Sequence, residues 1–152
     1  MRNLILLVAI PLLSVSICAG PVDREIDLVM REYSKIHASL TQDKTTGVDS
    51  AAQSIVKITS DVNTTDAKVL PLMASIRKAA QTIQGKDLSS ARIEFFELSK
   101  PLLAYVYQFY SGEQKYYRFY CDMAKKGWVQ DSENLRNPYY GSSMLTCGEL
   151  IE

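Results

Sequence analysis

Apolar residues recur at helical spacing through most of the first 110 residues. Over 22–40 they fall three and four positions apart, with charged residues between them, which predicts an amphipathic helix. The same pattern predicts helices over 48–59, 66–84 and 87–109. The apolar positions are Ile26, Val29, Met30, Tyr33, Ile36 and Leu40, then Ala51, Ala52, Ile55, Val56 and Ile58, then Leu70, Met73, Ile76, Ala80 and Ile83, and finally Ala91, Phe95, Leu98, Leu102, Tyr105, Val106 and Phe109.

Residues at the expected helix ends support these boundaries. Thr46 and Asp49 resemble a capping box at the start of the second helix, with Asp in place of the usual Glu. Gly85 suits a left-handed position after the third helix, and Asp87 can cap the start of the fourth. Pro101 falls inside the fourth helix and predicts a kink or break just before it.

Four helices with short polar connections predict an all-α fold, an antiparallel up-and-down four-helix bundle. Beyond Tyr110 no helical period continues, although the segment contains several aromatic, β-prone residues. We therefore expect residues 21–152 to form a single helical-bundle domain that ends in an irregular tail. A Cys/Met-containing loop over 119–149 occupies that tail.

The first twenty residues have the pattern of a secretory signal peptide. Arg2 precedes a short apolar run over 4–13, which is well below the roughly 20 residues that a bilayer requires. The sequence thus predicts an exported, periplasmic protein without a transmembrane segment in its mature chain. Cys18 leaves open a lipoprotein anchor, but bacterial lipoprotein sites usually carry a small side chain where Ile17 stands.

Composition argues against several classes of function. The chain carries 17 basic and 17 acidic residues, so it has no excess positive charge to attract nucleic acid or an anionic membrane. His37 is the only histidine, and we expect it to be structural rather than half of a nucleophile–base pair. No phosphate-binding loop or metalloprotease motif is present. The sequence therefore predicts a protein that is not an enzyme.

Two cysteines in the tail, Cys121 and Cys147, admit two interpretations. In an exported protein an even pair is most simply a disulfide. Such a bridge would close a loop of about 26 residues and would stabilise the fold by roughly 3.5 kcal/mol in the chain-entropy model. The alternative is a metal site, for which Met123 and Met144 supply thioether sulfurs beside the two thiols. Thiolate and thioether donors favour Cu(I) or a similar soft ion, whereas zinc usually takes histidine and not methionine.

The ordered motifs of the tail resemble an uncharacterised bacterial domain family. They are Cys121-x-Met123, Gly127-Trp128, Asn137-Pro-Tyr-x-Gly141, and Met144-Leu-x-Cys147-Gly. Members of this family resemble the C-terminal domain appended to CusB-type heavy-metal efflux adaptor (membrane-fusion) proteins, and also occur as separate exported proteins. Asp122 stands where members usually have proline.

The resemblance implies an extracytoplasmic helical domain linked to copper or other heavy-metal handling. Carried over to this chain, the implied ligands are Cys121, Met123, Met144 and Cys147. Its function would be to buffer Cu(I) or a related ion, or to hand it to a heavy-metal efflux adaptor or another periplasmic protein. The alternative is a scaffold or interaction domain with a structural Cys121–Cys147 disulfide and no cofactor.

Overall fold

The structure is a computed structural model and describes residues 22–151. The predicted signal peptide and the alternative anchor at Cys18 lie outside these residues. Four helices come first: α1 (Asp23–Thr41), α2 (Val48–Asp61), α3 (Val69–Thr82) and α4 (Leu88–Gln108). Strands β1 (Tyr117–Cys121) and β2 (Lys126–Gln130), the short 3-10 helix η1 (Gly141–Ser143) and strand β3 (Glu149–Ile151) follow.

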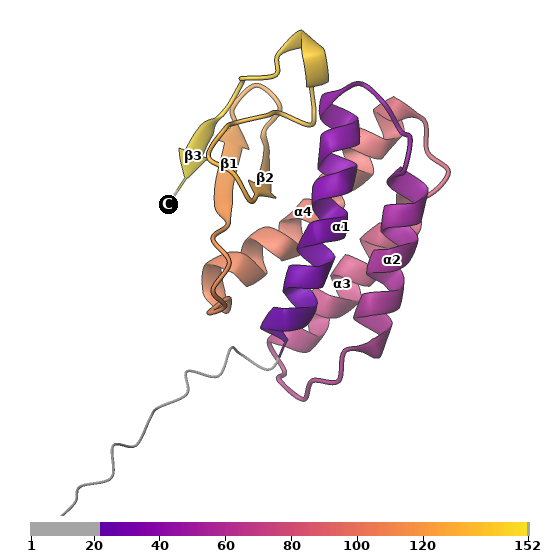
Figure 1. Cartoon of the computed structure of the whole chain (residues 1–152), viewed down its shortest axis with the longest axis vertical. Helices are drawn as coiled ribbons and strands as arrows, with labels where there is room; N and C mark the ends of the chain where they lie inside the picture. The colour runs from indigo at the N-terminus through magenta and orange to yellow at the C-terminus, as the bar shows by residue number, and fades with distance from the viewer. Residues whose placement is uncertain (1–21, 152) are drawn as a thin grey trace, which may run out of the picture.

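The four predicted helices are present, and each packs against its neighbour in the chain. Figure 1 shows them running alternately up and down, with α2 against α1, α3 against α2 and α4 against α3. Most apolar positions of the four helical patterns meet in one core, in which Ile26, Leu40 and Ile76 are completely buried. Leu70 is an exception, because it is 52% exposed. The periodicity of the first 110 residues therefore predicted the helical part of the fold.

Some of the predicted helix ends are confirmed and others are corrected. Asp87 caps α4 by accepting a hydrogen bond from the Ser90 N–H at 2.8 Å. The capping box at α2 does not form, because Asp49 instead accepts a hydrogen bond from the N–H of Gly85 at 2.9 Å. Gly85 has a φ of 69°, as expected for glycine after a helix. The break expected at Pro101 does not occur, since α4 continues through it.

The prediction of an all-α fold with an irregular tail is wrong. The tail forms a three-stranded antiparallel sheet in the order β2-β1-β3. We call residues 117–151 the C-terminal unit. β1 and β2 are five residues each and join through a turn over 122–125. Phe119 and Trp128 lie opposite each other and stack with ring centroids 5.5 Å apart. Such cross-strand aromatic pairs stabilise a sheet, but they leave no helical or long alternating pattern in the sequence.

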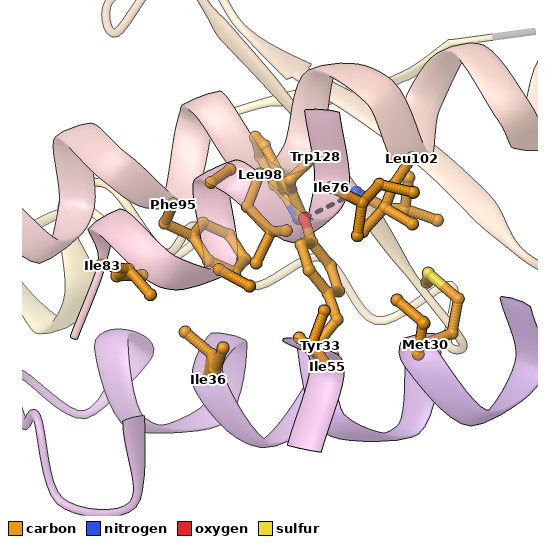
Figure 2. Close-up of a cluster of buried hydrophobic side chains, with 14 of the residues drawn as sticks. Met30, Tyr33, Ile36, Ile55, Ile76, Ile83, Phe95, Leu98, Leu102 and Trp128 are labelled. Carbon is orange, nitrogen blue, oxygen red and sulfur yellow. Dashed lines mark hydrogen bonds between the residues drawn. The ribbon is translucent and has the colours of Figure 1, made fainter. Parts of the chain in front are cut away.

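The sheet packs against the side of the bundle that α1 and α4 form. β2 contacts α4 closely, whereas α1 and α4 approach each other little. Trp128 of β2 is completely buried and lies close to Tyr33 of α1 and Leu98 of α4 in the hydrophobic cluster (Figure 2). The C-terminal unit therefore completes the core that the four helices leave open.

Two tyrosine hydroxyls bond the backbone of β2, which lies at one edge of the sheet. The hydroxyl of Tyr33 accepts a hydrogen bond from the Val129 N–H at 3.4 Å, and its ring stacks on Phe95 at 4.6 Å. The hydroxyl of Tyr139 donates to the carbonyl of Gly127 at 2.5 Å. Polar backbone groups at a sheet edge need such partners when they are buried. Side chains from the helices and from the tail thus hold β2 in place.

Candidate functional site

Cys121 is the last residue of β1 and is completely buried. The turn that follows it, over 122–125, reverses the chain into β2 and includes Lys125 with a φ of 52°. In this turn the N–H of Ala124 donates a hydrogen bond to the Cys121 sulfur at 3.4 Å. The geometry of the hairpin therefore fixes both the position of this sulfur and a donor that faces it.

Cys147 reaches the same place from the other end of the C-terminal unit. Its N–H donates to the carbonyl of Met144 at 3.1 Å, which forms a tight turn. Its carbonyl accepts a hydrogen bond from the side-chain amide of Asn137 at 2.7 Å. Gly148 follows with a φ of 146°, and a Cβ there would lie only 2.8 Å from the ring of Trp128. Only glycine fits this approach, after which β3 pairs with β1.

The two cysteine sulfurs lie 2.8 Å apart, and both cysteines are free thiols in the structure. The hydrogen bond between the two sulfurs raises the pKa of the Cys147 thiol, and desolvation and the Coulombic effect of Cys121 add to this. The backbone N–H of Met123 hydrogen-bonds the Cys147 sulfur and acts in the opposite direction. The net effect is that the pKa of the Cys147 thiol lies above its ordinary value.

The two predicted methionine ligands differ in their surroundings. Met123 is 65% exposed and lines a hollow of about 210 Å³ together with Cys147. The other lining residues are Tyr120, Asp122, Gly148 and Glu149. Met144 is half-buried and does not line this hollow. The structure thus brings the two cysteine sulfurs together and places Met123 at the hollow beside Cys147, whereas Met144 lies outside this hollow.

The charged residues at the hollow do not form a ligand set of their own. Asp122 pairs with Lys125 at 2.8 Å on the exposed side of the turn. Within residues 22–151, no three side chains of the His, Cys, Asp or Glu type converge as a metal site would require. A metal ion at this hollow would therefore depend on the two thiols and on a thioether.

Asn137 organises the loop that carries Cys147, and its role was missed in the sequence. The residue is completely buried, and its N–H donates to the carbonyl of Leu145 at 2.7 Å. Its side-chain oxygen accepts hydrogen bonds from the N–H groups of Tyr139 and Tyr140. The Asn-Pro turn was visible in the sequence, and the bonds to Tyr139 and Tyr140 belong to that turn. The partners Leu145 and Cys147 lie further along the chain and could not be inferred from it.

A second set of contacts ties this loop to the helices. Arg92 of α4 donates hydrogen bonds to the carbonyls of Pro138 and Leu40, both at 3.0 Å, and forms an ion pair with Asp43. The hydroxyl and the N–H of Ser142 both donate to the Asp43 carboxylate. These contacts hold 137–143 against the ends of α1 and α4, and through Asn137 they hold Cys147.

His37 proves to be structural, as expected. It lies on α1, is 8% exposed, and its Nε2 hydrogen-bonds the carbonyl of Arg136 at 2.7 Å. Because that oxygen accepts, Nε2 carries the proton. Burial lowers the pKa of His37 from 6.5 to about 4, so the ring is neutral at pH 7. The residue joins α1 to the C-terminal unit and lines none of the hollow beside Cys147.

Comparisons with protein-family models, curated proteins and solved structures find no match to this chain. None of the helices within residues 22–151 is long and apolar enough to cross a membrane.

Proposed function

We propose that this protein binds a soft metal ion of the Cu(I) or Ag(I) type without catalysing a reaction. The observation that carries the proposal is that two thiol sulfurs lie 2.8 Å apart and that Cys147 lines a hollow together with the exposed Met123. Deprotonated cysteines and a thioether form the donor set that selects soft ions. Hard cations would need more oxygen ligands than this hollow offers.

Metal entry requires a small local movement. Two thiolates that bind one ion at about 2.3 Å with tetrahedral angles lie roughly 3.7 Å apart, so the sulfurs must separate by about 1 Å. Cys121 is fixed in β1, whereas Cys147 lies in an irregular turn beside the hollow. The movement would therefore occur at Cys147. This shift would also leave the bound ion accessible to Met123 from the hollow.

The proposal includes an extracytoplasmic location and transfer to a partner. The signal-peptide pattern over 1–20 supports export. The resemblance to domains found with heavy-metal efflux adaptors supports a role in buffering the ion, or in handing it to such an adaptor or another periplasmic protein. An exposed thioether suits transfer, because a partner can reach the ion from solvent at Met123.

Competition with a Cu(I) chelator tests the proposed ligand set. Cys18→Ser is introduced into every variant so that the third cysteine cannot contribute. The reduced protein is titrated with Cu(I) and bathocuproine disulfonate without oxygen. We expect one Cu(I) per chain, no tight binding after Cys121→Ser, and about tenfold weaker binding after Met123→Leu.

Met144→Leu is the matched control for Met123→Leu, because both replace a thioether with a side chain of similar volume. We expect it to leave the Cu(I) affinity unchanged, since Met144 does not line the hollow. Binding that is absent from the parent protein, or that survives Cys121→Ser, would contradict the proposal.

The 2.8 Å separation of the sulfurs also favours a second candidate function, a scaffold or interaction domain with a structural Cys121–Cys147 disulfide. In that case the bridge would close the C-terminal unit and no metal would bind. Intact mass of the exported protein without reductant distinguishes the two. A chain that is two hydrogens lighter, and that gains no copper even after full reduction, would support the scaffold.

A further inference from the structure

The two sulfurs of the pair differ in their access to solvent. Cys121 is 0% exposed and lies beneath the turn over 122–125. Cys147 is half-buried, and it lines the open hollow next to Met123. A disulfide reagent can therefore reach Cys147 but not Cys121. In a pair of thiols within bonding reach, this inequality determines the order in which the sulfurs react.

We propose that Cys121 and Cys147 form a reversible thiol–disulfide exchange site, in which Cys147 is the attacking sulfur and Cys121 the resolving sulfur. The co-reactant is a small disulfide such as glutathione disulfide, or an exposed disulfide of another protein. The further statement that this exchange controls metal binding rests on the proposed function. The assignment of the two sulfurs does not.

The exchange proceeds in two balanced steps. The thiolate of Cys147 attacks one sulfur of the reagent disulfide, forms a mixed disulfide and releases one thiolate. Cys121, whose sulfur lies 2.8 Å away, then loses its proton and attacks the Cys147 sulfur. This step forms the Cys121–Cys147 bond and releases the second thiolate. The two cysteines together lose two electrons and two protons, which the reagent gains as two thiols.

Backbone groups around the pair suit both steps. The N–H of Ala124 faces the Cys121 sulfur at 3.4 Å, and the N–H of Met123 faces the Cys147 sulfur. Such donors stabilise a thiolate.

Oxidation would remove the metal site that we propose. Once the two sulfurs are bonded to each other, neither is a thiolate, and Met123 is the only remaining sulfur ligand among the residues that line the hollow. A single thioether is a weak ligand compared with two thiolates. The pair would therefore hold the ion in its reduced state and release it on oxidation.

Reaction with glutathione disulfide tests the assignment on the full chain carrying Cys18→Ser. Intact mass is followed over time for the reduced parent, Cys121→Ser and Cys147→Ser. We expect the parent to lose two hydrogens without retaining glutathione. Cys121→Ser should accumulate one glutathione adduct, because no resolving sulfur remains. Cys147→Ser should form an adduct about tenfold more slowly or not at all, because Cys121 is buried.

Circular dichroism of the two serine variants provides the control for folding, and both should match the parent. An adduct that forms on Cys147→Ser as fast as on Cys121→Ser, in folded variants, would overturn the assignment. So would a parent protein that retains glutathione and never loses two hydrogens. If the expected pattern holds but the reduced protein binds no Cu(I), the proposed function fails and the assignment of the two sulfurs stands.

Discussion

The helical bundle and the C-terminal unit are stabilised by different interactions. The bundle core consists mainly of apolar side chains, and Ile36, Ile55 and Leu102 are completely buried in it. The buried polar side chains of the helices, such as Thr59 and Ser99, lie among these apolar contacts. The C-terminal unit is organised around two buried amides, Gln130 and Asn137, whose side chains hydrogen-bond surrounding groups. Apolar packing is non-directional and tolerates substitutions of similar volume, whereas a buried polar group requires each of its partners.

Gln130 illustrates how the C-terminal unit uses such a group. Its side-chain oxygen accepts hydrogen bonds from the indole N–H of Trp128 and from the N–H of Arg136. Its amide nitrogen donates to the carbonyls of Ser132 and Asn134. One side chain thus closes the loop after β2 by satisfying four groups. We therefore expect single polar substitutions to damage the C-terminal unit, whereas the bundle should respond mainly to lost volume.

The largest effect is expected from removing volume in the bundle. Phe95 is completely buried and stacks on Tyr33, so Phe95→Ala should lower the free energy of unfolding by about 4 kcal/mol. Urea denaturation followed by circular dichroism measures this. Ile93→Ala is the control on the same helix, since Ile93 is 55% exposed and the loss should be about 0.5 kcal/mol or less. Equal losses for the two variants would contradict the packing described for α4.

A polar substitution in the C-terminal unit should cost nearly as much. Asn137→Ala removes few apolar contacts but leaves the carbonyl of Cys147 and the N–H of Tyr139 without their partners. We expect a loss of about 3 kcal/mol in the free energy of unfolding, measured by urea denaturation with Trp128 fluorescence. Asn134→Ala is the control, because Asn134 is exposed and its side chain should matter little. A loss below about 1 kcal/mol for Asn137→Ala would show that the unit does not depend on this amide.

Acid should weaken the junction between the two regions through His37. Its pKa is about 4 in the folded protein and 6.5 ordinarily, so the unfolded chain binds the proton first as the pH falls. The contribution of neutral His37 to the free energy of unfolding is therefore fully present above pH 6.5. About 3 kcal/mol of this free energy is lost as the pH falls to 4. Urea denaturation at several pH values measures it. His37→Gln keeps an amide donor for Arg136 and should show a shallower loss over the same range. Parallel curves would exclude this role for His37.

Two glycines give the smallest expected difference. Gly85 lies between bundle helices with φ 69° and nothing near its missing Cβ, so Gly85→Ala should cost about 1 kcal/mol through backbone strain alone. Gly141 has φ 56°, and a Cβ there would overlap Asp43 and Arg92. Gly141→Ala should cost about 2 kcal/mol, because strain is added to the loss of the Arg92–Asp43 contacts. Thermal denaturation of both variants compares them directly. Equal destabilisation of the two variants would mean that the Arg92–Asp43 contacts contribute nothing to the stability of the fold.

The sequence predicted part of the candidate site, but it did not predict which methionine lies beside the two cysteines. Cys121 and Cys147 were expected to form a pair because an exported chain with two cysteines offers few alternatives. In the structure the two cysteine sulfurs lie 2.8 Å apart. Met123 was placed on the same side as Cys121 by its spacing along the chain, and it does line the hollow with Cys147. Met144 was grouped with Cys147 by the same argument, but the turn between them directs only its carbonyl to Cys147.

The sequence by itself determined the four helices, because helical periodicity and capping are properties of residues at most a few positions apart. Tertiary structure alone decided the sheet, since five-residue strands become stable only when Trp128 and Tyr33 bury each other against the helices. It also decided the partner of Asp49. The sequence predicted a capping contact at the start of α2, but the Asp49 carboxylate accepts its hydrogen bond from the N–H of Gly85 instead. Asn137 bonds the N–H of Tyr139 within its own turn, but it reaches the carbonyl of Cys147 only after the chain has folded back on itself. Contacts between distant residues depend on which surfaces meet, and no local pattern records that choice.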